Sequence, residues 1–451
     1  MNHPLVVIGA GPIGLAAAAH AAERGLPFVI LETGPHAGSA VAEWSHVRLF
    51  SAWRELVDPA ARRLLESTGS WTAPDDDGHP TGGEWGRHYL QPLADALDAV
   101  AGGSVRYGAT VVGVGRAGRD LLVDSGRQQD PFAVHVRSGI GVERLLARAV
   151  VDASGTWRQP NPLGADGYPA LGEREHADRI SYGAPDFDDP AVAARFGGRH
   201  VVLAGRGASA QAALIGLARL ADDHPTTRVS WLLRRPVVGD AFGGGDNDQL
   251  EERGRLGQAA RTAAATGPVT TVTRFRTESV IAQRDGRLTV RSVDGQQVSD
   301  VDELIVVTGF RPDLGFLSEV RLDLDPALGS PRVLADQIHP DHHSCGDVAA
   351  HGHRELAQPE RGLFLVGMKS YGRAPSFLAL TGFEQVRSVV AALDGDLASA
   401  NRVGLVLPET GVCNGAGAFD DDADALAAGD GCCGGPMTAD PQLVTLGRAP
   451  R

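Results

Sequence analysis

The sequence predicts an α/β protein with two doubly wound, Rossmann-like nucleotide-binding domains, small antiparallel β additions and a glycine-rich C-terminal tail. Two repeated features predict this class. A glycine-rich turn between an apolar strand and a helix occurs near residue 9 and again near residue 205, as dinucleotide-binding units require. An apolar strand also ends in a small residue followed by glycine at Ser154-Gly155 and again at Thr308-Gly309, so each nucleotide domain closes in the same way.

The first unit begins with an apolar run at residues 4–8, which is typical of a buried parallel strand. Gly9, Gly11 and Gly14 follow in the pattern G-x-G-x-x-G, whose glycines permit a tight turn, the close approach of a pyrophosphate and close packing of helix on sheet. Glu32 ends the next strand, where a carboxylate accepts hydrogen bonds from an adenosine ribose and repels a 2′-phosphate. The unit therefore favours FAD or NAD over NADP, and an ordinary structural turn is the alternative.

The second unit contains Gly205, Gly207 and Ser209 in the turn that follows an apolar strand. Its next strand ends in Arg234 and Arg235, in contrast to the carboxylate of the first unit. Two guanidinium groups favour a 2′-phosphate, so this unit predicts NADPH. The alternative is a solvated arginine pair at the end of a strand.

The chain of 451 residues exceeds what one ordinary core accommodates, so two domains, or two domains and a tail, are expected. Alternating or apolar runs predict a small antiparallel meander at 105–114, 132–137 and 147–152, and further strands at 269–273, 278–283, 287–292 and 303–308. The predicted domains are residues 1–158, the first part of an FAD-binding domain; 159–315, an inserted NADPH-binding domain; 316–400, the second part of the FAD-binding domain; and 401–451, a cysteine-containing tail.

In the second part of the FAD-binding domain, a buried strand ends at Gly367 and a polar loop with Lys369 and Arg373 follows. Pro375 is predicted as the first residue of a helix from about 376 to 393. The N-terminus of such a helix favours the negative charge that a flavin gains on reduction, and the two cations would add to this effect. Surface solvation is the alternative for both cations.

No protein acid or base stands out in the sequence. The candidates for a catalytic role are Lys369, Arg373, Arg48 and Cys345. Arg48 lies in the aromatic segment 44–53, which in a flavoprotein would pass near the isoalloxazine ring; packing of a long loop is the alternative. Cys345 is either a small buried hydrophobic residue or a reactive thiol.

The other three cysteines, Cys413, Cys432 and Cys433, lie in the tail. Adjacent thiols do not readily form a strain-free disulfide with each other. They can instead bind a soft ion together, with Cys413 as a third thiolate. Trivalent arsenic fits such a site, zinc and mercury compete for it, and incidental tail cysteines are the alternative.

The formal charge of −14 and the absence of a basic stripe argue against a nucleic-acid partner. No apolar run approaches the roughly 20 residues of a membrane helix, and the N-terminus passes straight into the first strand without room for a signal sequence. A soluble cytoplasmic protein that acts on a small-molecule substrate is therefore expected. The sequence leaves the oligomeric state, including a homodimer, open.

Residues 1–395 resemble the flavoproteins with two dinucleotide-binding domains, which include thioredoxin reductases and flavin-containing monooxygenases. The resemblance rests on the two nucleotide turns, the two strand ends and the closing strand, loop and helix. By this resemblance FAD is bound by Gly9, Gly11, Gly14 and Glu32, and NADPH by Gly205, Gly207, Ser209, Arg234 and Arg235; Gly309 and Gly367 complete the predicted cofactor-binding set.

Departures from the family patterns discriminate between reactions. The disulfide reductases carry a cysteine pair beside the flavin and end the closing strand in Gly-Asp, whereas this chain has no cysteine before Cys345 and has Gly367-Met368. The monooxygenase pattern F-x-G-x-x-x-H followed by an aromatic residue is matched at Gly172 and His176, but its Phe is absent and Ile180 occupies the aromatic position. Thiol chemistry of the thioredoxin-reductase type is therefore disfavoured.

A narrower resemblance is to the flavin monooxygenase-like proteins of bacterial arsenic-resistance operons. It rests on Ser344-Cys345-Gly346, on the segment 367–375 and on Cys432-Cys433-Gly434-Gly435. The leading hypothesis is an NADPH-dependent FAD monooxygenase that oxygenates a soft nucleophile such as a trivalent arsenical. The rivals are a flavin reductase that passes electrons to a metal or metalloid held by the tail thiols, and a metalloid-binding protein whose flavin is structural.

Overall fold

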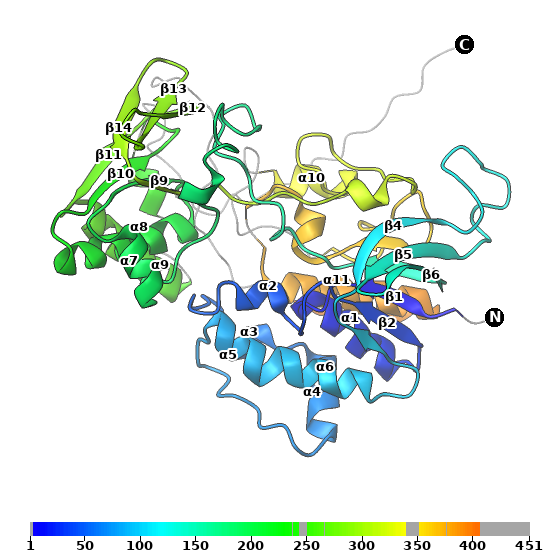
Figure 1. Ribbon diagram of the computed structural model, residues 1–451. Helices are drawn as coiled ribbons and strands as arrows, with labels where there is room; N and C mark the ends of the chain where they lie inside the picture. The colour runs from blue at the N-terminus through cyan, green and yellow to red at the C-terminus, as the bar shows by residue number, and fades with distance from the viewer. Residues whose placement is uncertain are drawn as a thin grey trace, which may run out of the picture. The chain divides into compact units, whose positions relative to one another are not determined.

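The computed structural model describes residues 3–236, 238–242, 250–265, 267–339, 351–375 and 377–405 (Figure 1). The predictions made for Cys345, Cys413, Cys432 and Cys433 lie outside these residues. Of the described helices, none combines the length and apolarity needed to span a membrane.

The first sheet is wholly parallel and has the order β16-β7-β1-β2-β3. Residues near both ends of the described chain therefore share one sheet, because β16 pairs with β7. Central strands of this sheet are buried on both faces, which explains their continuous apolar sequences. The strands are β1 (Leu5–Ile8), β2 (Phe28–Leu31), β3 (Val105–Arg106), β7 (Ala149–Asp152) and β16 (Leu363–Leu365).

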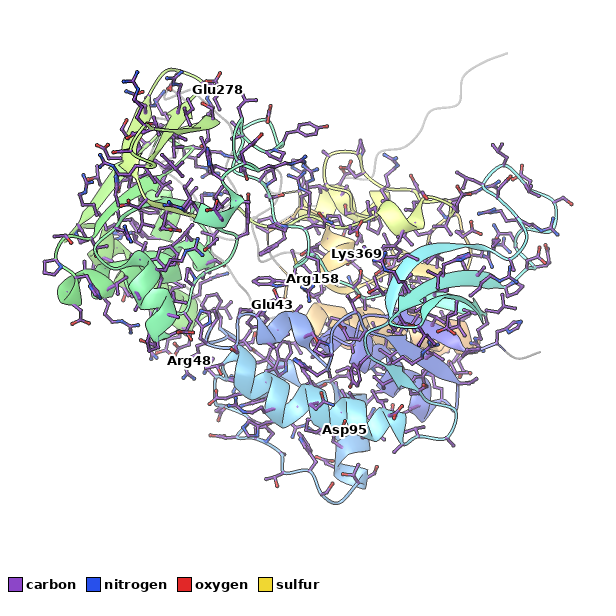
Figure 2. The ribbon with its side chains drawn as sticks, viewed as in Figure 1. Glu43, Arg48, Asp95, Arg158, Glu278 and Lys369 are labelled. Atoms are coloured by element: carbon purple, nitrogen blue, oxygen red, sulfur yellow. The ribbon has the colours of Figure 1, made fainter. Side chains whose placement is uncertain are left out.

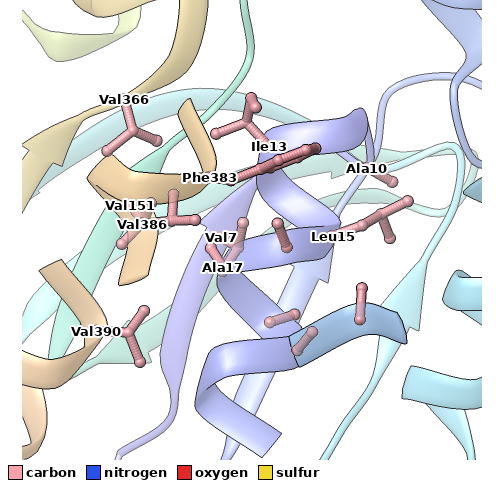
Figure 3. Packing of buried hydrophobic residues seen from close by; sticks show 14 of the residues in the cluster. Val7, Ala10, Ile13, Leu15, Ala17, Val151, Val366, Phe383, Val386 and Val390 are labelled. Atoms are coloured by element: carbon pink, nitrogen blue, oxygen red, sulfur yellow. The ribbon is translucent and has the colours of Figure 1, made fainter. Parts of the chain in front are cut away.

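Two helices form the core on one face of this sheet, α1 (Pro12–Glu23) and α11 (Ala379–Asp394). Figure 3 shows Ile13 of α1 beside Phe383 of α11, in the same cluster as Val151 of β7. The run of small residues in α1 lets the helices and the sheet approach closely. The other helical segments of this part are α2 (Ser39–Ala42), α3 (Trp53–Leu56), α4 (Pro59–Ser67), α5 (Gly82–Trp85), η1 (Gly86–Leu90), α6 (Gln91–Asp98), η5 (Gly315–Leu317), α10 (Arg332–Ile338), η6 (Gly367–Tyr371) and α12 (Leu397–Ala400).

The predicted start of the last long helix is wrong. Helix α11 begins at Ala379 and not at Pro375. The preceding residues are held in a turn, because the Arg373 N–H donates to the carbonyl of Leu328 and the Ala374 N–H to that of Tyr371. This local structure delays the helix until Leu378, which is its N-cap.

The second sheet is also parallel and has the order β11-β10-β9-β15-β8. It holds the second glycine turn between β9 and α8. Its elements are η2 (Ala177–Arg179), β8 (Ile180–Ser181), α7 (Pro190–Phe196), β9 (His200–Ala204), α8 (Ala208–Asp223), β10 (Arg228–Leu232), η3 (Gly239–Phe242), α9 (Glu251–Ala265), β11 (Val269–Val272) and β15 (Glu303–Val306).

Two antiparallel sheets of three strands accompany the parallel ones: β4 (Thr110–Arg116), β5 (Phe132–Ser138) and β6 (Gly141–Ala147); and β12 (Thr277–Ala282), β13 (Leu288–Ser292) and β14 (Gln297–Val301). The predicted meander is correct for β4 and β5 only. Residues 105–106 and 149–152 join the parallel sheet, and the third strand is β6. Most of β6 is exposed, so its sequence lacks the apolar signal of a strand.

The two chain segments that join the parallel sheets pair with each other. The Asn161 N–H donates to the carbonyl of Gly309, and the Arg311 N–H donates to that of Gln159, both at 2.9 Å. The side chain of Asn161 adds a hydrogen bond to the carbonyl of Thr308. The segment that enters the second sheet and the segment that leaves it therefore lie side by side.

A buried ion cluster ties the meander β4–β6 to the segment before β16. The Glu360 carboxylate accepts hydrogen bonds from Arg116 Nε at 2.7 Å and from Arg127 Nη2 at 2.7 Å, and the carboxylate is fully buried. Burial raises the pKa of Glu360, but the hydrogen bonds from the two arginines outweigh this effect, so its pKa lies below the ordinary value. A carboxyl group with a lowered pKa stabilises the fold above its unfolded-state pKa and loses that contribution as the pH falls.

We expect Glu360→Gln to destabilise the fold by about 3–5 kcal/mol at pH 7, because it leaves two buried guanidinium groups without their carboxylate. Thermal unfolding followed by circular dichroism measures this change. The difference between wild type and variant should shrink as the pH falls below about 4.3. Glu143→Gln, which removes the half-exposed partner of Arg106, is the control and should cost less than about 1 kcal/mol. Equal midpoints for wild type and Glu360→Gln would contradict a stabilising role of the cluster.

Candidate functional site

The first glycine turn is shaped by its contact with the end of β7. Gly9 has φ +100°, and a Cβ atom there would lie 2.9 Å from the carbonyl oxygen of Ala153. A Cβ atom at Gly14 would lie 2.0 Å from the carbonyl oxygen of Gly9. At Gly11, in contrast, no atom of the described residues lies within 4 Å of such a position. Two glycines therefore close the turn against the protein, and the third leaves open space where a ligand can approach the backbone.

Glu32 is held at the edge of this turn. Its Oε2 atom accepts a hydrogen bond from the Ala10 N–H at 2.8 Å, and Oε1 accepts one from the Gly34 N–H at 2.7 Å. The side chain is half-buried, and each carboxylate oxygen retains a second lone pair. The carboxylate is thus fixed beside the N-terminus of α1.

The second turn repeats this geometry. Gly205 has φ +132°, and a Cβ atom there would lie 2.4 Å from the carbonyl oxygen of Val307, at the end of β15. Gly207 again faces open space among the described residues, and Ser209 is exposed in the first turn of α8. The two units therefore share one construction, with an opening glycine packed against the end of a neighbouring strand.

The two predicted arginines follow β10 at the carboxyl edge of the second sheet. Arg234 is exposed and Arg235 is half-buried, and the Arg235 carbonyl accepts a hydrogen bond from the Arg274 N–H. Ligands of doubly wound sheets bind outside the carboxyl ends of the strands. Both residues therefore lie at the edge of the sheet where ligands of this sheet type bind.

Lys369 is completely buried, so the alternative of surface solvation is wrong for this residue. Its Nζ atom lies 2.6 Å from Asp152 Oδ2, an ion pair, and donates a hydrogen bond to Ser154 Oγ at 3.0 Å. Ser154 Oγ in turn donates to Asp152 Oδ1 at 2.6 Å. The sequence analysis missed Asp152, whose position at the end of an apolar strand was its only signal.

The other described candidates do not join Lys369. Arg373 is exposed, and Arg48 is exposed with its guanidinium donating to the carbonyl of His79. Figure 2 shows Arg48 well apart from Lys369. Gly367 lies at the start of η6, where a Cβ atom would lie 3.1 Å from Ile13 of α1. Gly309 lies in the paired connecting segments.

A polar group that the sequence analysis missed lies in the segment resembling the monooxygenase pattern. Glu173 is fully buried and accepts hydrogen bonds from the Leu163 N–H, the Ala170 N–H and the Tyr182 hydroxyl. Burial, together with the hydrogen bond to Glu173, raises the pKa of Tyr182. Three donors satisfy the carboxylate, which therefore organises this loop.

Aromatic residues connect the two paired connecting segments to the region around α2. The Trp157 ring lies 4.7 Å from the Phe310 ring and 6.4 Å from the Trp44 ring. Glu43 accepts a hydrogen bond from Trp157 Nε1 at 2.8 Å and pairs with Arg158 (Figure 2). These contacts fix the first connecting segment to the end of α2. Trp44 of the aromatic segment 44–53 thus packs against Trp157.

Comparisons with known proteins agree with this geometry. Residues 7–69 match the family described as an NAD(P)-binding Rossmann-like domain. A search of curated protein sequences gives no significant match. Among solved structures, a bacillithiol disulfide reductase from Bacillus cereus is similar with a TM-score of 0.62 and 18% identity, over 88% of this chain and 99% of that one.

Monooxygenase structures are similar to a comparable degree. A cadaverine monooxygenase from Erwinia amylovora, bound to FAD, has a TM-score of 0.60 and 12% identity over 91% of this chain and 98% of that one. A flavin monooxygenase from Stenotrophomonas maltophilia has a TM-score of 0.52 and 21% identity over 87% and 98%. The predicted fold is therefore confirmed: this chain has the Rossmann-type architecture of flavin-dependent reductases and monooxygenases.

We expect Gly11→Val to weaken nucleotide binding at the first turn and Gly207→Val to weaken it at the second. Both residues have extended backbone and open space, so the apoproteins should keep their unfolding temperature. The side chain would block the approach of a pyrophosphate and lower the affinity on the order of 100-fold. Titration of each apoprotein with FAD and with NADPH measures the effect. Gly86→Ala is the control, and loss of both nucleotides in one variant would contradict separate sites.

Proposed function

We propose that the protein is an NADPH-dependent FAD monooxygenase that oxygenates a soft nucleophile, in the narrower form a trivalent arsenical. The observation that carries the proposal is the repeated glycine turn with opposite charges beside it. Glu32 stands at the first turn and Arg234 and Arg235 follow the strand of the second. This contrast supports an FAD site without a 2′-phosphate and an NADPH site with one.

In this proposal the chain's own residues bind and orient the cofactors. The open backbone at Gly11 and the N-terminus of α1 would hold the FAD pyrophosphate, and the Glu32 carboxylate would hold the ribose. The Gly207 turn and the two arginines would hold NADPH. When bound, FAD accepts the hydride equivalent of NADPH and passes electrons to oxygen, which is chemistry that side chains do not supply.

One observation favours oxygenation over disulfide reduction, and the similar structures are compatible with oxygenation. Residues 1–344 contain no cysteine. This stretch therefore cannot provide the pair of thiols that the disulfide reductases of the similar flavoprotein family carry beside the flavin. The solved structures of similar fold include a cadaverine monooxygenase and a flavin monooxygenase. The similarity to a bacillithiol disulfide reductase keeps the reductase as the second candidate.

The proposed substrate follows from the thiols of the tail and from the narrower resemblance. Trivalent arsenic has a lone pair that accepts an oxygen atom, and it binds thiolates such as those of Cys413, Cys432 and Cys433. The overall reaction balances: one oxygen atom of O₂ goes to arsenic, the other leaves as water, and NADPH supplies two electrons. In the reductase alternative, the same electrons go to a metal or metalloid held by the thiols.

We expect the double variant Arg234→Ala/Arg235→Ala to raise the KM for NADPH by about 10- to 100-fold, since each guanidinium contributes a charge-assisted hydrogen bond to a 2′-phosphate. The KM for NADH, which lacks this phosphate, should stay nearly constant. Steady-state oxidation of both nucleotides checks this. Arg287→Ala, which removes an exposed arginine paired with Asp285, is the control. An equal rise for both nucleotides would count against recognition of the phosphate.

We expect the FAD-loaded protein to consume oxygen and NADPH in a one-to-one ratio when arsenite or a methylated trivalent arsenical is added, with a pentavalent product. An oxygen electrode, NADPH absorbance and speciation of arsenic measure the three quantities. Hydrogen peroxide as the sole oxygen product would argue against oxygenation. Cys432→Ser/Cys433→Ser separates the candidates: complete loss of NADPH oxidation supports the reductase, and retained oxygenation at a higher KM supports the monooxygenase.

A further inference from the structure

A buried charged cluster lies at the carboxyl end of β7 and is not used in the proposed chemistry. Lys369 and Asp152 both have 0% of their side-chain surface exposed, and their charged atoms are 2.6 Å apart. Ser154 bridges the two, because its Oγ accepts from Lys369 and donates to Asp152. The Ser154 N–H also donates to Asp152 Oδ1 at 3.1 Å.

The ammonium group of Lys369 makes three contacts among the described residues. Besides Asp152 and Ser154, it lies 4.4 Å from the centroid of the Phe316 ring, at the distance of a cation–π contact. An ammonium group without partners is costly to bury, whereas a paired one is tolerated. Within the described residues, the charge of Lys369 is thus compensated by Asp152.

The two partners lie on segments that both touch the N-terminal part of α1. The chain after Asp152 packs on the glycine turn, since the Ala153 carbonyl is what a Cβ atom at Gly9 would meet. The η6 turn that carries Lys369 begins at Gly367, which is packed against Ile13 in the first turn of α1. The ion pair thus joins two segments that contact the site proposed for the FAD pyrophosphate.

A second set of hydrogen bonds fixes η6 to α11. Gln385 of α11 accepts from the Gly367 N–H at 2.8 Å and donates to Ser370 Oγ at 2.9 Å. The η6 turn therefore has hydrogen bonds to α11 and an ion pair with the last residue of β7. Lys369 contributes a side-chain contact between this turn and β7, the strand whose end packs against Gly9.

We propose that Lys369 and Asp152 are positioning residues for FAD: their ion pair sets the spacing of the two segments and compensates the charge of a carboxylate beside the proposed pyrophosphate site. The inference rests on the proposed function, because it takes FAD as the ligand of the first turn. The reason is electrostatic. A lone Asp152 carboxylate near the proposed pyrophosphate site would repel the diphosphate, whereas a carboxylate paired with Lys369 has no net charge.

The test uses the full-length apoprotein and three variants, Lys369→Met, Asp152→Asn and the double variant. FAD affinity is measured by fluorescence titration, and thermal unfolding of each apoprotein is recorded separately. Lys369→Met leaves a negative charge and should weaken FAD binding by about tenfold or more. Asp152→Asn leaves a positive charge and should weaken it less, and the double variant should return to within about threefold of wild type.

A purely structural role predicts a different pattern, namely equal loss in both single variants in proportion to the fall in unfolding temperature. That pattern, or unchanged FAD affinity in Lys369→Met, would overturn the inference. If Lys369→Met does not fold, the double variant decides: FAD affinity more than about tenfold below wild type in a folded double variant is contrary to the proposal. Glu303→Gln, which breaks the ion pair with Arg195 in the second sheet, is the control and should leave FAD affinity unchanged.

Failure of the proposed function is recognised independently. If the wild-type apoprotein does not bind FAD, the function proposed for the first turn is wrong, and the positioning role falls with it. If wild-type FAD binding is tight and the four proteins differ only in stability, the proposed function stands and the positioning role is wrong.

Discussion

A close contact between a glycine and the carbonyl group of a neighbouring strand end determines both candidate cofactor sites. Gly9 meets Ala153, and Gly205 meets Val307, at distances that leave no room for a side chain. Each contact brings the start of a helix to the carboxyl edge of its parallel sheet, where the helix N-terminus presents free N–H groups. The open backbone at Gly11 and Gly207, and hence the proposed binding of two nucleotides, depends on these two contacts.

The parts of the fold that the sequence predicted are those with a strong local signal. Buried parallel strands such as β1 and β9 are continuous apolar runs, and the glycine turns have fixed spacing. The exposed strand β6 has no such run, and β3 has two residues only, so neither was assigned correctly. The start of α11 was missed because a turn formed with distant Leu328 overrides the preference of Pro375 for a helix start.

The buried charges could not be predicted because their partners are distant in sequence. Lys369 resembles a surface cation in a polar loop, yet it is completely buried and pairs with Asp152, which precedes it by more than two hundred residues. Glu360 and Arg116 are equally remote from each other. In the candidate site, sequence spacing located the two glycine turns, whereas the side chains that support these turns required the tertiary structure.

The pairing of the two connecting segments has an evolutionary consequence. Because Asn161 bonds to Gly309 and Arg311 to Gln159, residues 162–308 begin and end side by side. A segment whose ends already meet can be inserted into a host domain without separating the host's strands, and the entropic cost of closing it depends only weakly on its length. Residues 162–308 thus have the arrangement of an insertion within the rest of the chain. The inner unit can diverge in its nucleotide preference while the outer sheet, completed by β16, keeps its own packing.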